Sequence, residues 1–115
     1  MDTRKLGHTS LNVSRICFGT MTFGSQMDEA TAHRTLDYCV DHGINFIDTA
    51  NVYNRGESER ITGKWMAHHR SKVVLATKVR GKMGDGADEQ GLSKAAIAVS
   101  YTHLYRSLRH GALCY

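Results

Sequence analysis

The chain has 115 residues, of which 41% are hydrophobic and 23% charged, a composition typical of one soluble globular domain. The net charge of +4 is spread along the chain without a basic block or interleaved aromatics, so we expect no nucleic-acid partner. No apolar run reaches the ~20 residues that span a bilayer, and no signal peptide opens the chain, so we expect no membrane partner. Three scattered cysteines, Cys17, Cys39 and Cys114, imply no disulfide framework and favour a cytoplasmic protein.

The predicted elements begin with a small hairpin. Residues 4–6 and 11–13 flank a turn at 7–10, which indicates two short antiparallel strands. Three apolar segments then predict buried strands at residues 15–19, 44–48 and 73–78. They begin at 15, 44 and 73, a constant interval of 29 residues that matches a parallel strand with its crossover helix.

Helices are predicted between these strands. Asp28 is a suitable N-cap for a helix that runs to about His42, and Gly43 is placed to end it in a left-handed conformation. Apolar residues at positions 32, 36, 39 and 40 form one stripe on this helix. A second helix is predicted over residues 59–68, with its apolar side chains turned inward, namely Ile61, Trp65 and Met66.

Strands that alternate with helices at a constant period predict an α/β fold with a parallel sheet. Two architectures fit this pattern, an open doubly wound sheet and a closed (β/α)8 barrel. A closed barrel takes about 250 residues, so length favours the open sheet unless the chain is a piece of a larger protein. Neither phosphate-binding fingerprint is met, because Ser25 and Gln26 replace the Lys-Ser/Thr of a P-loop after the glycines at 19 and 24.

Three polar residues fall where strand ends should converge. Asp48 ends the second predicted strand, Tyr53 lies five residues further on, and Lys78 ends the third. The carboxyl ends of parallel strands meet on one face, where ligands bind. A phenol exchanges protons poorly at neutral pH, but a neighbouring ammonium favours its phenolate form and a carboxylate can hold that ammonium. Each residue also fits a structural role, as a turn cap, a surface aromatic or an exposed strand end, and the pattern alone leaves both interpretations open. No cluster has metal-ligand spacing, so no metal is expected.

The segment 48–59, Asp-Thr-Ala-Asn-Val-Tyr-Asn-Arg-Gly-Glu-Ser-Glu, with Gly63 beyond it, resembles the signature of the aldo-keto reductase superfamily. Residues 4–7, 17–24, 43–47 and 74–78 resemble other segments of that family. The resemblance extends from about residue 4 to residue 97. Because the family folds as a (β/α)8 barrel closed at its bottom by an N-terminal hairpin, the resemblance implies a partial (β/α)8 TIM barrel with the hairpin and about the first three βα units.

The resemblance also implies a function. Members reduce aldehydes and ketones with a nicotinamide cofactor, usually NADPH, through a Tyr, Lys, Asp and His tetrad. By position, Tyr53 would be the general acid, Lys78 would favour its ionisation, and Asp48 would hold Lys78. The resemblance further implies that the first loop contacts the nicotinamide end of the cofactor through Gly19, Thr20 and Met21.

The same resemblance leaves a non-catalytic alternative, because potassium-channel β subunits share the fold and resemble the chain over residues 19–24. Retention of Asp48, Tyr53 and Lys78 favours catalysis on a small-molecule carbonyl substrate. Residues 80–91 would form a glycine-rich loop on the substrate side.

The chain departs from the family pattern after residue 98, so we expect residues 1–98 to be barrel and residues 99–115 to be a tail of different origin. The tetrad histidine should follow an apolar fourth strand, and neither His103 nor His110 has that context. Residues 99–104, Val-Ser-Tyr-Thr-His-Leu, match the translation of a transposon end used in sequencing libraries. We therefore expect adapter read-through or a frameshift, with an alternatively spliced or degenerate end as the alternative.

Three strands of a barrel leave an open edge and an uncovered inner face. We therefore expect the 115-residue chain by itself to be molten or poorly soluble and to lack saturable NADPH binding. The predicted activity belongs to the parent protein.

Overall fold

The computed structural model describes residues 1–105; residues 106–115, which include His110 and Cys114, lie outside the described part. The predicted hairpin is present. Strands β1 (Thr3–Lys5) and β2 (Asn12–Ser14) pair antiparallel, with Thr3 opposite Ser14. Asn45 joins the hairpin to the rest of the molecule, because its Oδ1 accepts from the Ser14 N–H at 2.7 Å and its N–H donates to Ser14 Oγ at 3.1 Å.

The three predicted parallel strands are also present, as β3 (Cys17–Gly19), β4 (Phe46–Asp48) and β5 (Val74–Ala76), in the order β3-β4-β5. Each is shorter than its apolar segment. The segments that follow β4 and β5 stay paired beyond the strands, because the Asn51 N–H donates to the Lys78 carbonyl at 3.0 Å. The last residues of the three strands, Gly19, Asp48 and Ala76, are in register.

Helix α1 (Glu29–Asp41) begins and ends as predicted. The Asp28 carboxylate accepts from the Thr31 N–H at 2.7 Å, and Gly43 has a φ of +78°. Helix α2 (Glu57–Met66) begins two residues earlier than predicted, because Gly56, with a φ of +85°, turns the chain directly from the 3₁₀ turn η1 (Tyr53–Gly56) into the helix. A second 3₁₀ turn, η2 (Arg70–Lys72), precedes β5.

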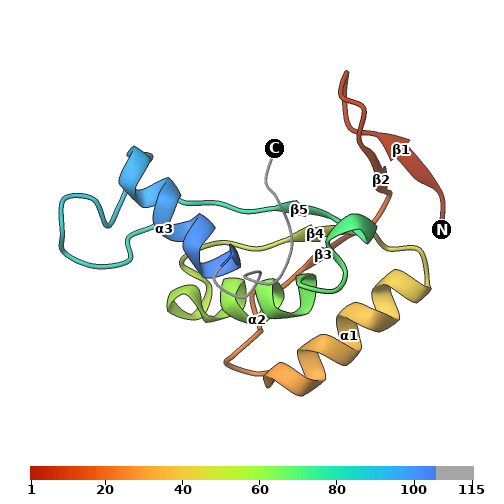
Figure 1. The fold of residues 1–115 in the computed structure, drawn as a ribbon, viewed down its shortest axis with the longest axis horizontal. Coiled ribbons are helices and arrows are strands. Elements are labelled where there is room, and N and C mark those ends of the chain that lie inside the picture. Colours follow the sequence, from red (N-terminus) through yellow and green to blue (C-terminus); the bar gives the residue numbers. More distant parts are fainter. Residues whose placement is uncertain (106–115) are drawn as a thin grey trace.

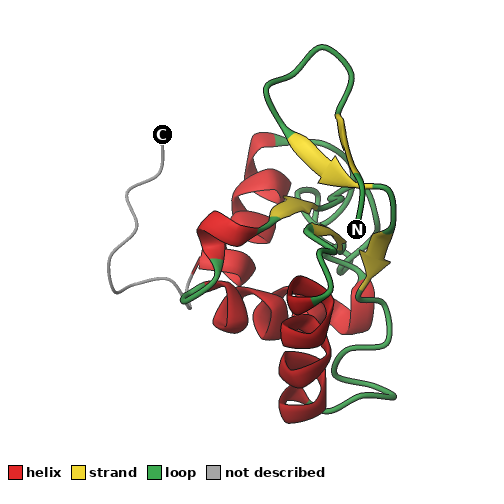
Figure 2. Cartoon of the chain, turned by 90° about the vertical axis from the view of Figure 1, so that its right-hand side faces the viewer, coloured by secondary structure: helices red, strands yellow, loops and turns green. Residues whose placement is uncertain are grey.

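The two faces of the parallel sheet differ. Phe18, Ile47 and Leu75, the middle residues of the strands, pack with α1 and α2 in the hydrophobic core. Figures 1 and 2 show these helices beside the sheet. The core takes residues of both predicted apolar stripes, including Ala32, Leu36, Ile61, Trp65 and Met66. On the opposite face, Cys17 and Gly19 are exposed, and Asp48 is only partly buried.

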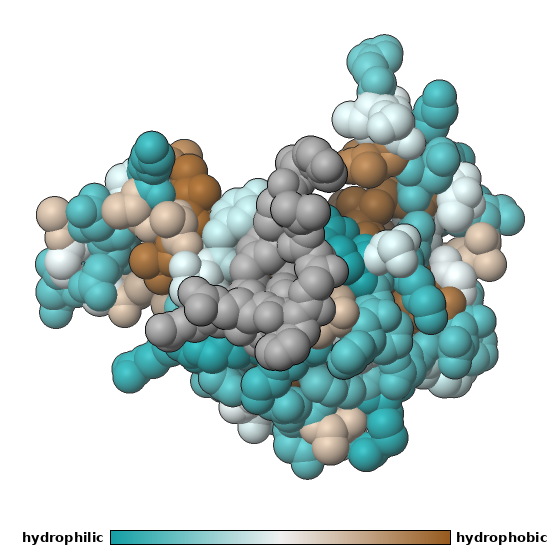
Figure 3. Space-filling model, viewed as in Figure 1, coloured by the Kyte–Doolittle hydropathy of each residue, from teal (hydrophilic) through white to brown (hydrophobic). Residues whose placement is uncertain are grey.

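Helix α3 (Lys94–Tyr105) follows a long connection and packs against α2. The predicted boundary between residues 98 and 99 falls inside this helix. The two helices approach closely at Gly63, where a Cβ would overlap the backbone of Leu104. Apolar side chains remain exposed on α3 and beside the hairpin, and Figure 3 shows these as separate brown patches. None of the helices in residues 1–105 is long and apolar enough to cross a membrane.

Candidate active site

Lys78 and Asp48 form the centre of the predicted site. The Lys78 ammonium donates to both carboxylate oxygens of Asp48, at 2.7 and 2.6 Å, and to the carbonyl oxygen of Thr49 at 2.8 Å. Asp48 is the last residue of β4, and Lys78 lies two residues past β5. Because side chains alternate along a strand, both lie on the face opposite α1 and α2. The structure therefore brings these two predicted residues together.

The charge on Lys78 is stabilised by its surroundings. Burial acts to lower the pKa of Lys78, but the Asp48 carboxylate and the Tyr53 phenol outweigh it and raise that pKa above its usual value. About half of the side chain is exposed, so solvent screens these interactions. The direction of the shift means that Lys78 is an ammonium throughout the neutral range.

Tyr53 completes the predicted group. It is the first residue of η1, and the Lys78 Nζ lies 5.1 Å from the centre of its ring. The next two residues, Asn54 and Arg55, have left-handed φ angles of 49° and 53°, which non-glycine residues rarely adopt. The Asn54 side-chain amide donates to the Gly24 carbonyl at 2.5 Å and fixes this strained turn to the loop after β3. The site can therefore hold a phenol next to a carboxylate-bound ammonium.

The loop residues 19–21 lie at the carboxyl end of β3, in three different environments. A Cβ on Gly19 would meet no atom within 4 Å, and Met21 is 64% exposed. Thr20 is fully buried instead. Its N–H donates to the Asp48 carbonyl at 3.0 Å, and its hydroxyl lies 2.7 Å from that of Ser58. The Thr20 side chain is thus part of the support beneath the site rather than of its open surface.

Two kinds of residue near the site were not predicted from the sequence. Cys17 lies on the same face; burial and the Asp48 carboxylate raise the pKa of its thiol, and Lys78 opposes them. Beneath the site, Ser58 and Glu59 on α2 are fully buried and bonded to threonines. The sequence signal for these contacts is a threonine directly after each of the first two predicted strands, at positions 20 and 49, and another inside the third, at position 77.

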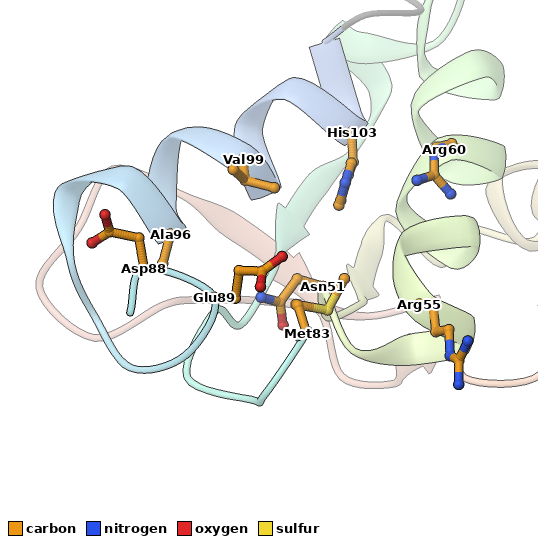
Figure 4. A pocket seen from close by; sticks show the side chains of 9 residues that line it. All are labelled: Asn51, Arg55, Arg60, Met83, Asp88, Glu89, Ala96, Val99 and His103. Atoms are coloured by element: carbon orange, nitrogen blue, oxygen red, sulfur yellow. The ribbon is translucent and has the colours of Figure 1, made fainter. Parts of the chain in front are cut away.

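A separate cavity of about 200 Å³ lies between the 80–91 loop, α2 and α3. Figure 4 shows its lining, namely Asn51, Arg55, Arg60, Met83, Asp88, Glu89, Ala96, Val99 and His103. Asp48, Tyr53 and Lys78 do not line it. Within residues 1–105, the buried Oδ1 of Asn51 has no hydrogen-bond partner. The predicted substrate-side loop therefore borders this cavity in the present chain.

His103, to which no tetrad role was assigned, is on α3. Its Nδ1 lies 2.9 Å from Glu59 Oε2, and its side chain is 13% exposed. His103 therefore contacts Glu59 on α2 and not the Lys78 ammonium. His110 lies outside the described residues.

Comparison with known proteins identifies the family. The chain matches the model of the aldo/keto reductase family over residues 15–110. The chain belongs to this family. It is 50% identical over 95 residues to the uncharacterized oxidoreductase YrpG of Bacillus subtilis, an alignment covering 76% of this chain and 29% of that protein. It is 40% identical over 101 residues to a probable voltage-gated potassium channel subunit beta of Arabidopsis thaliana, covering 84% of this chain and 30% of the relative.

A solved aldo-keto reductase, AKR11C1 from Bacillus halodurans in its holo form, superposes with a TM-score of 0.76 at 37% identity. The match covers 95% of this chain and 37% of that one. The chain thus spans less than a third of the two curated relatives. The fold is a partial (β/α)8 barrel with an N-terminal hairpin, as the resemblance implied.

Proposed function

We propose that the parent protein reduces aldehydes or ketones to alcohols with NADPH, using Tyr53 as the general acid. The observation that carries this proposal is the Lys78 ammonium, which is bound by both oxygens of Asp48 and lies 5.1 Å from the centre of the Tyr53 ring. The exposed position of this group at the carboxyl ends of parallel strands supports a catalytic role over a purely structural one.

The proton chemistry follows from these three residues. Tyr53 gives its phenolic proton to the carbonyl oxygen, so its O–H bond breaks as the new alcohol O–H bond forms. Lys78 stabilises the phenolate that remains, and Asp48 holds Lys78 in place. The raised pKa of Lys78 supports this role, because a neutral amine would not stabilise a phenolate.

The residues at the end of β3 are compatible with a nicotinamide cofactor. The space above Gly19 is open, and this residue is paired with Asp48 in the sheet. A flat ring would therefore have room to approach the sheet beside the Asp48 carboxylate. The exposed Met21 and the backbone of Thr20 would border that ring. A nicotinamide cofactor supplies the hydride for this reduction when it is bound.

The direct experiment uses the complete gene product and follows NADPH consumption with an aldehyde. Tyr53→Phe removes only the phenolic hydroxyl, and we expect kcat to fall by ~10³-fold, within the range of general acid catalysis. The matched control is Tyr38→Phe, since Tyr38 is exposed on α1 and stacks on His42. Equal rates for Tyr53→Phe and Tyr38→Phe would contradict the proposal.

A second function is favoured by one observation, the 40% identity to a probable potassium channel β subunit. A binding subunit of this fold would retain the barrel without rapid turnover. Single-turnover oxidation of bound NADPH by an aldehyde separates the two functions. Turnover that Tyr53→Phe abolishes supports the reductase, and cofactor binding without any turnover supports the binding subunit.

We also propose that residues 99–115 lie outside the native reading frame. The match of residues 99–104 to a translated transposon end supports this. Resequencing the locus from the codon of Lys94, with a library made without that transposon, tests it. A frame that continues into an apolar strand ending in histidine is expected, and the same 17 codons followed by a stop would refute it.

A further inference from the structure

Three threonines form a row just past the ends of the parallel strands. Thr20 follows β3, Thr49 follows β4 and Thr77 follows β5, each by one residue. Because Gly19, Asp48 and Ala76 are in register, the threonines continue that register by one position. Alternation along the strands turns the three side chains toward the helices, while Asp48 and Lys78 lie on the opposite face.

The three threonine hydroxyls bond to the first turn of α2, two of them to Ser58 and the third to Glu59. Ser58 Oγ lies 2.7 Å from Thr20 Oγ1 and 3.1 Å from Thr49 Oγ1, and it donates to the Thr20 carbonyl at 2.8 Å. Thr77 Oγ1 donates to Glu59 Oε1 at 2.6 Å. Ser58 and Glu59 therefore connect one helix end to the ends of three strands.

Glu59 is a fully buried carboxylate, and burying a charge is costly unless hydrogen bonds compensate it. Besides Thr77, it accepts from Ser100 Oγ at 2.5 Å and faces His103 Nδ1 at 2.9 Å, both on α3. The bond to Thr77 joins two residues of the 1–98 part. Neither that bond nor the contacts of Ser58 with Thr20 and Thr49 involve residues 99–115.

We propose that Ser58 and Glu59 are positioning residues that set the geometry of Asp48, Lys78 and Tyr53, an inference that rests on the proposed function. Thr49 is the next residue after Asp48, and Thr77 is the residue before Lys78. Tyr53 opens η1, which continues directly into α2. One rigid helix turn thus fixes the carboxylate, the ammonium and the phenol relative to one another.

This arrangement differs from ordinary core packing in what it predicts. If the bonds served stability alone, breaking the Thr77 bond to α2 would have the same consequences as breaking a threonine hydrogen bond within α2. If they position the site, the bond at Thr77 affects the chemical step, because small displacements of catalytic groups reduce rates strongly.

The test uses the complete gene product and compares two isosteric substitutions. Thr77→Val removes the bond between β5 and Glu59. Thr62→Val is the matched control, because Thr62 is fully buried on α2 and its hydroxyl donates within the helix, to the Ser58 carbonyl at 2.7 Å. We measure kcat, KM, NADPH affinity, Tm and the pH dependence of kcat for both.

We expect Thr77→Val to lower kcat about tenfold, below the ~100-fold that a 1 Å displacement can cost, and to displace the pH profile. KM and NADPH affinity should stay within about twofold by the same reasoning, since no binding group is removed. Thr62→Val should lower Tm without changing the pH profile. Thr77→Ser, which retains the hydroxyl, should restore kcat.

Ser58→Ala gives an independent measurement with a minimal change of volume, and should also lower kcat with a displaced pH profile. The proposal is overturned if Thr77→Val or Ser58→Ala changes Tm alone, as Thr62→Val does. Tyr53→Phe in the same assay separates the two levels of inference. If Tyr53→Phe is inactive while Thr77→Val has wild-type kcat, only the positioning role fails; if Tyr53→Phe is fully active, the proposed function fails as well.

Discussion

The two faces of the parallel sheet are built from the same strands but are completed to very different extents. On the helix-facing side, Ile47, Thr20 and Thr49 are fully buried, and the hydroxyls of the three threonines past the strands all have hydrogen-bond partners. On the opposite side, the Asp48 and Lys78 side chains remain 34% and 51% exposed. The difference indicates that the helix-facing side is packed within residues 1–105, whereas the side that carries Asp48 and Lys78 is open to solvent.

The helix-facing side of the sheet and the side with Asp48 and Lys78 should therefore affect different properties. We expect substitutions on the first to change stability and substitutions on the second to change the proposed activity. Apolar burial on the helix side supplies the main stabilising free energy. The inner face instead presents charged groups whose interactions are screened by solvent in the present chain. Substitutions on the two faces therefore separate folding from catalysis.

The largest effect is expected from Lys78→Met in the complete gene product, because the ammonium proposed to stabilise the Tyr53 phenolate is lost. We expect kcat to fall by ~10³-fold, with Tm nearly unchanged. The control is Lys64→Met, since Lys64 is an exposed lysine on α2 that pairs with Glu29 at 2.6 Å. Steady-state kinetics distinguish the two variants. Similar kcat values for both would contradict a catalytic role for the sheet face that carries Asp48 and Lys78.

On the helix-facing side, Leu36→Ala should destabilise the protein by about 2–5 kcal/mol, because it leaves a cavity at a fully buried position. Ile16→Ala removes a side chain that is 52% exposed and should cost less than about 1 kcal/mol. Urea unfolding of the complete gene product measures both. Equal losses would mean that the helix side does not hold the core that the structure indicates.

The contact between the loop after β3 and the turn that leads into α2 is tested by Gly24→Ala. Gly24 has a φ of +79°, and an added Cβ would lie 2.6 Å from Glu57 Cγ and 2.8 Å from Asn54 Nδ2. Gly7→Ala is the control, since Gly7 has a φ of +56° but nothing within 4 Å. Both variants should lose the roughly 1–2 kcal/mol of a left-handed residue, and Gly24→Ala should lose more through the clash. Thermal unfolding gives the order, and a greater loss for Gly7→Ala would contradict the packing described.

The smallest effect is expected from Asp28→Ala, which removes the cap of α1. Hydrogen bonds from the Thr31 backbone N–H lower the pKa of Asp28 below its usual value. A lowered pKa in the folded state means that the ionised cap contributes stability above the pKa of the unfolded chain, and that this contribution is lost as the pH falls through the folded value. The Tm difference between wild type and Asp28→Ala should therefore be present at neutral pH and shrink on acidification below the usual aspartate pKa. A difference that is constant with pH would argue against the charged cap.

Much of the helix-facing structure was predictable, because it depends on local patterns. The Asp28 cap, the apolar stripe with Leu36 and the constant strand interval each predicted an element that is present. The juxtaposition of Asp48 with Lys78 followed from the convergence of parallel strand ends.

Long-range contacts were not predictable in the same way. The bond from Thr77 to Glu59 joins residues 18 positions apart, and no periodicity encodes it. Thr20 was assigned by resemblance to the cofactor loop, yet its hydroxyl is buried against Ser58, because a neighbouring helix decides which side of the backbone is open. Residue identity at a strand end thus predicts proximity to the site more reliably than it predicts the contacts beneath it.

The contrast between the two faces is tested most directly by titrating NADPH, with cofactor fluorescence as the readout, into the 115-residue chain and into the complete gene product side by side. If the inner face is incomplete in the shorter chain, only the complete product should show saturable binding. Saturable binding by the 115-residue chain, with an affinity close to that of the complete product, would contradict the account.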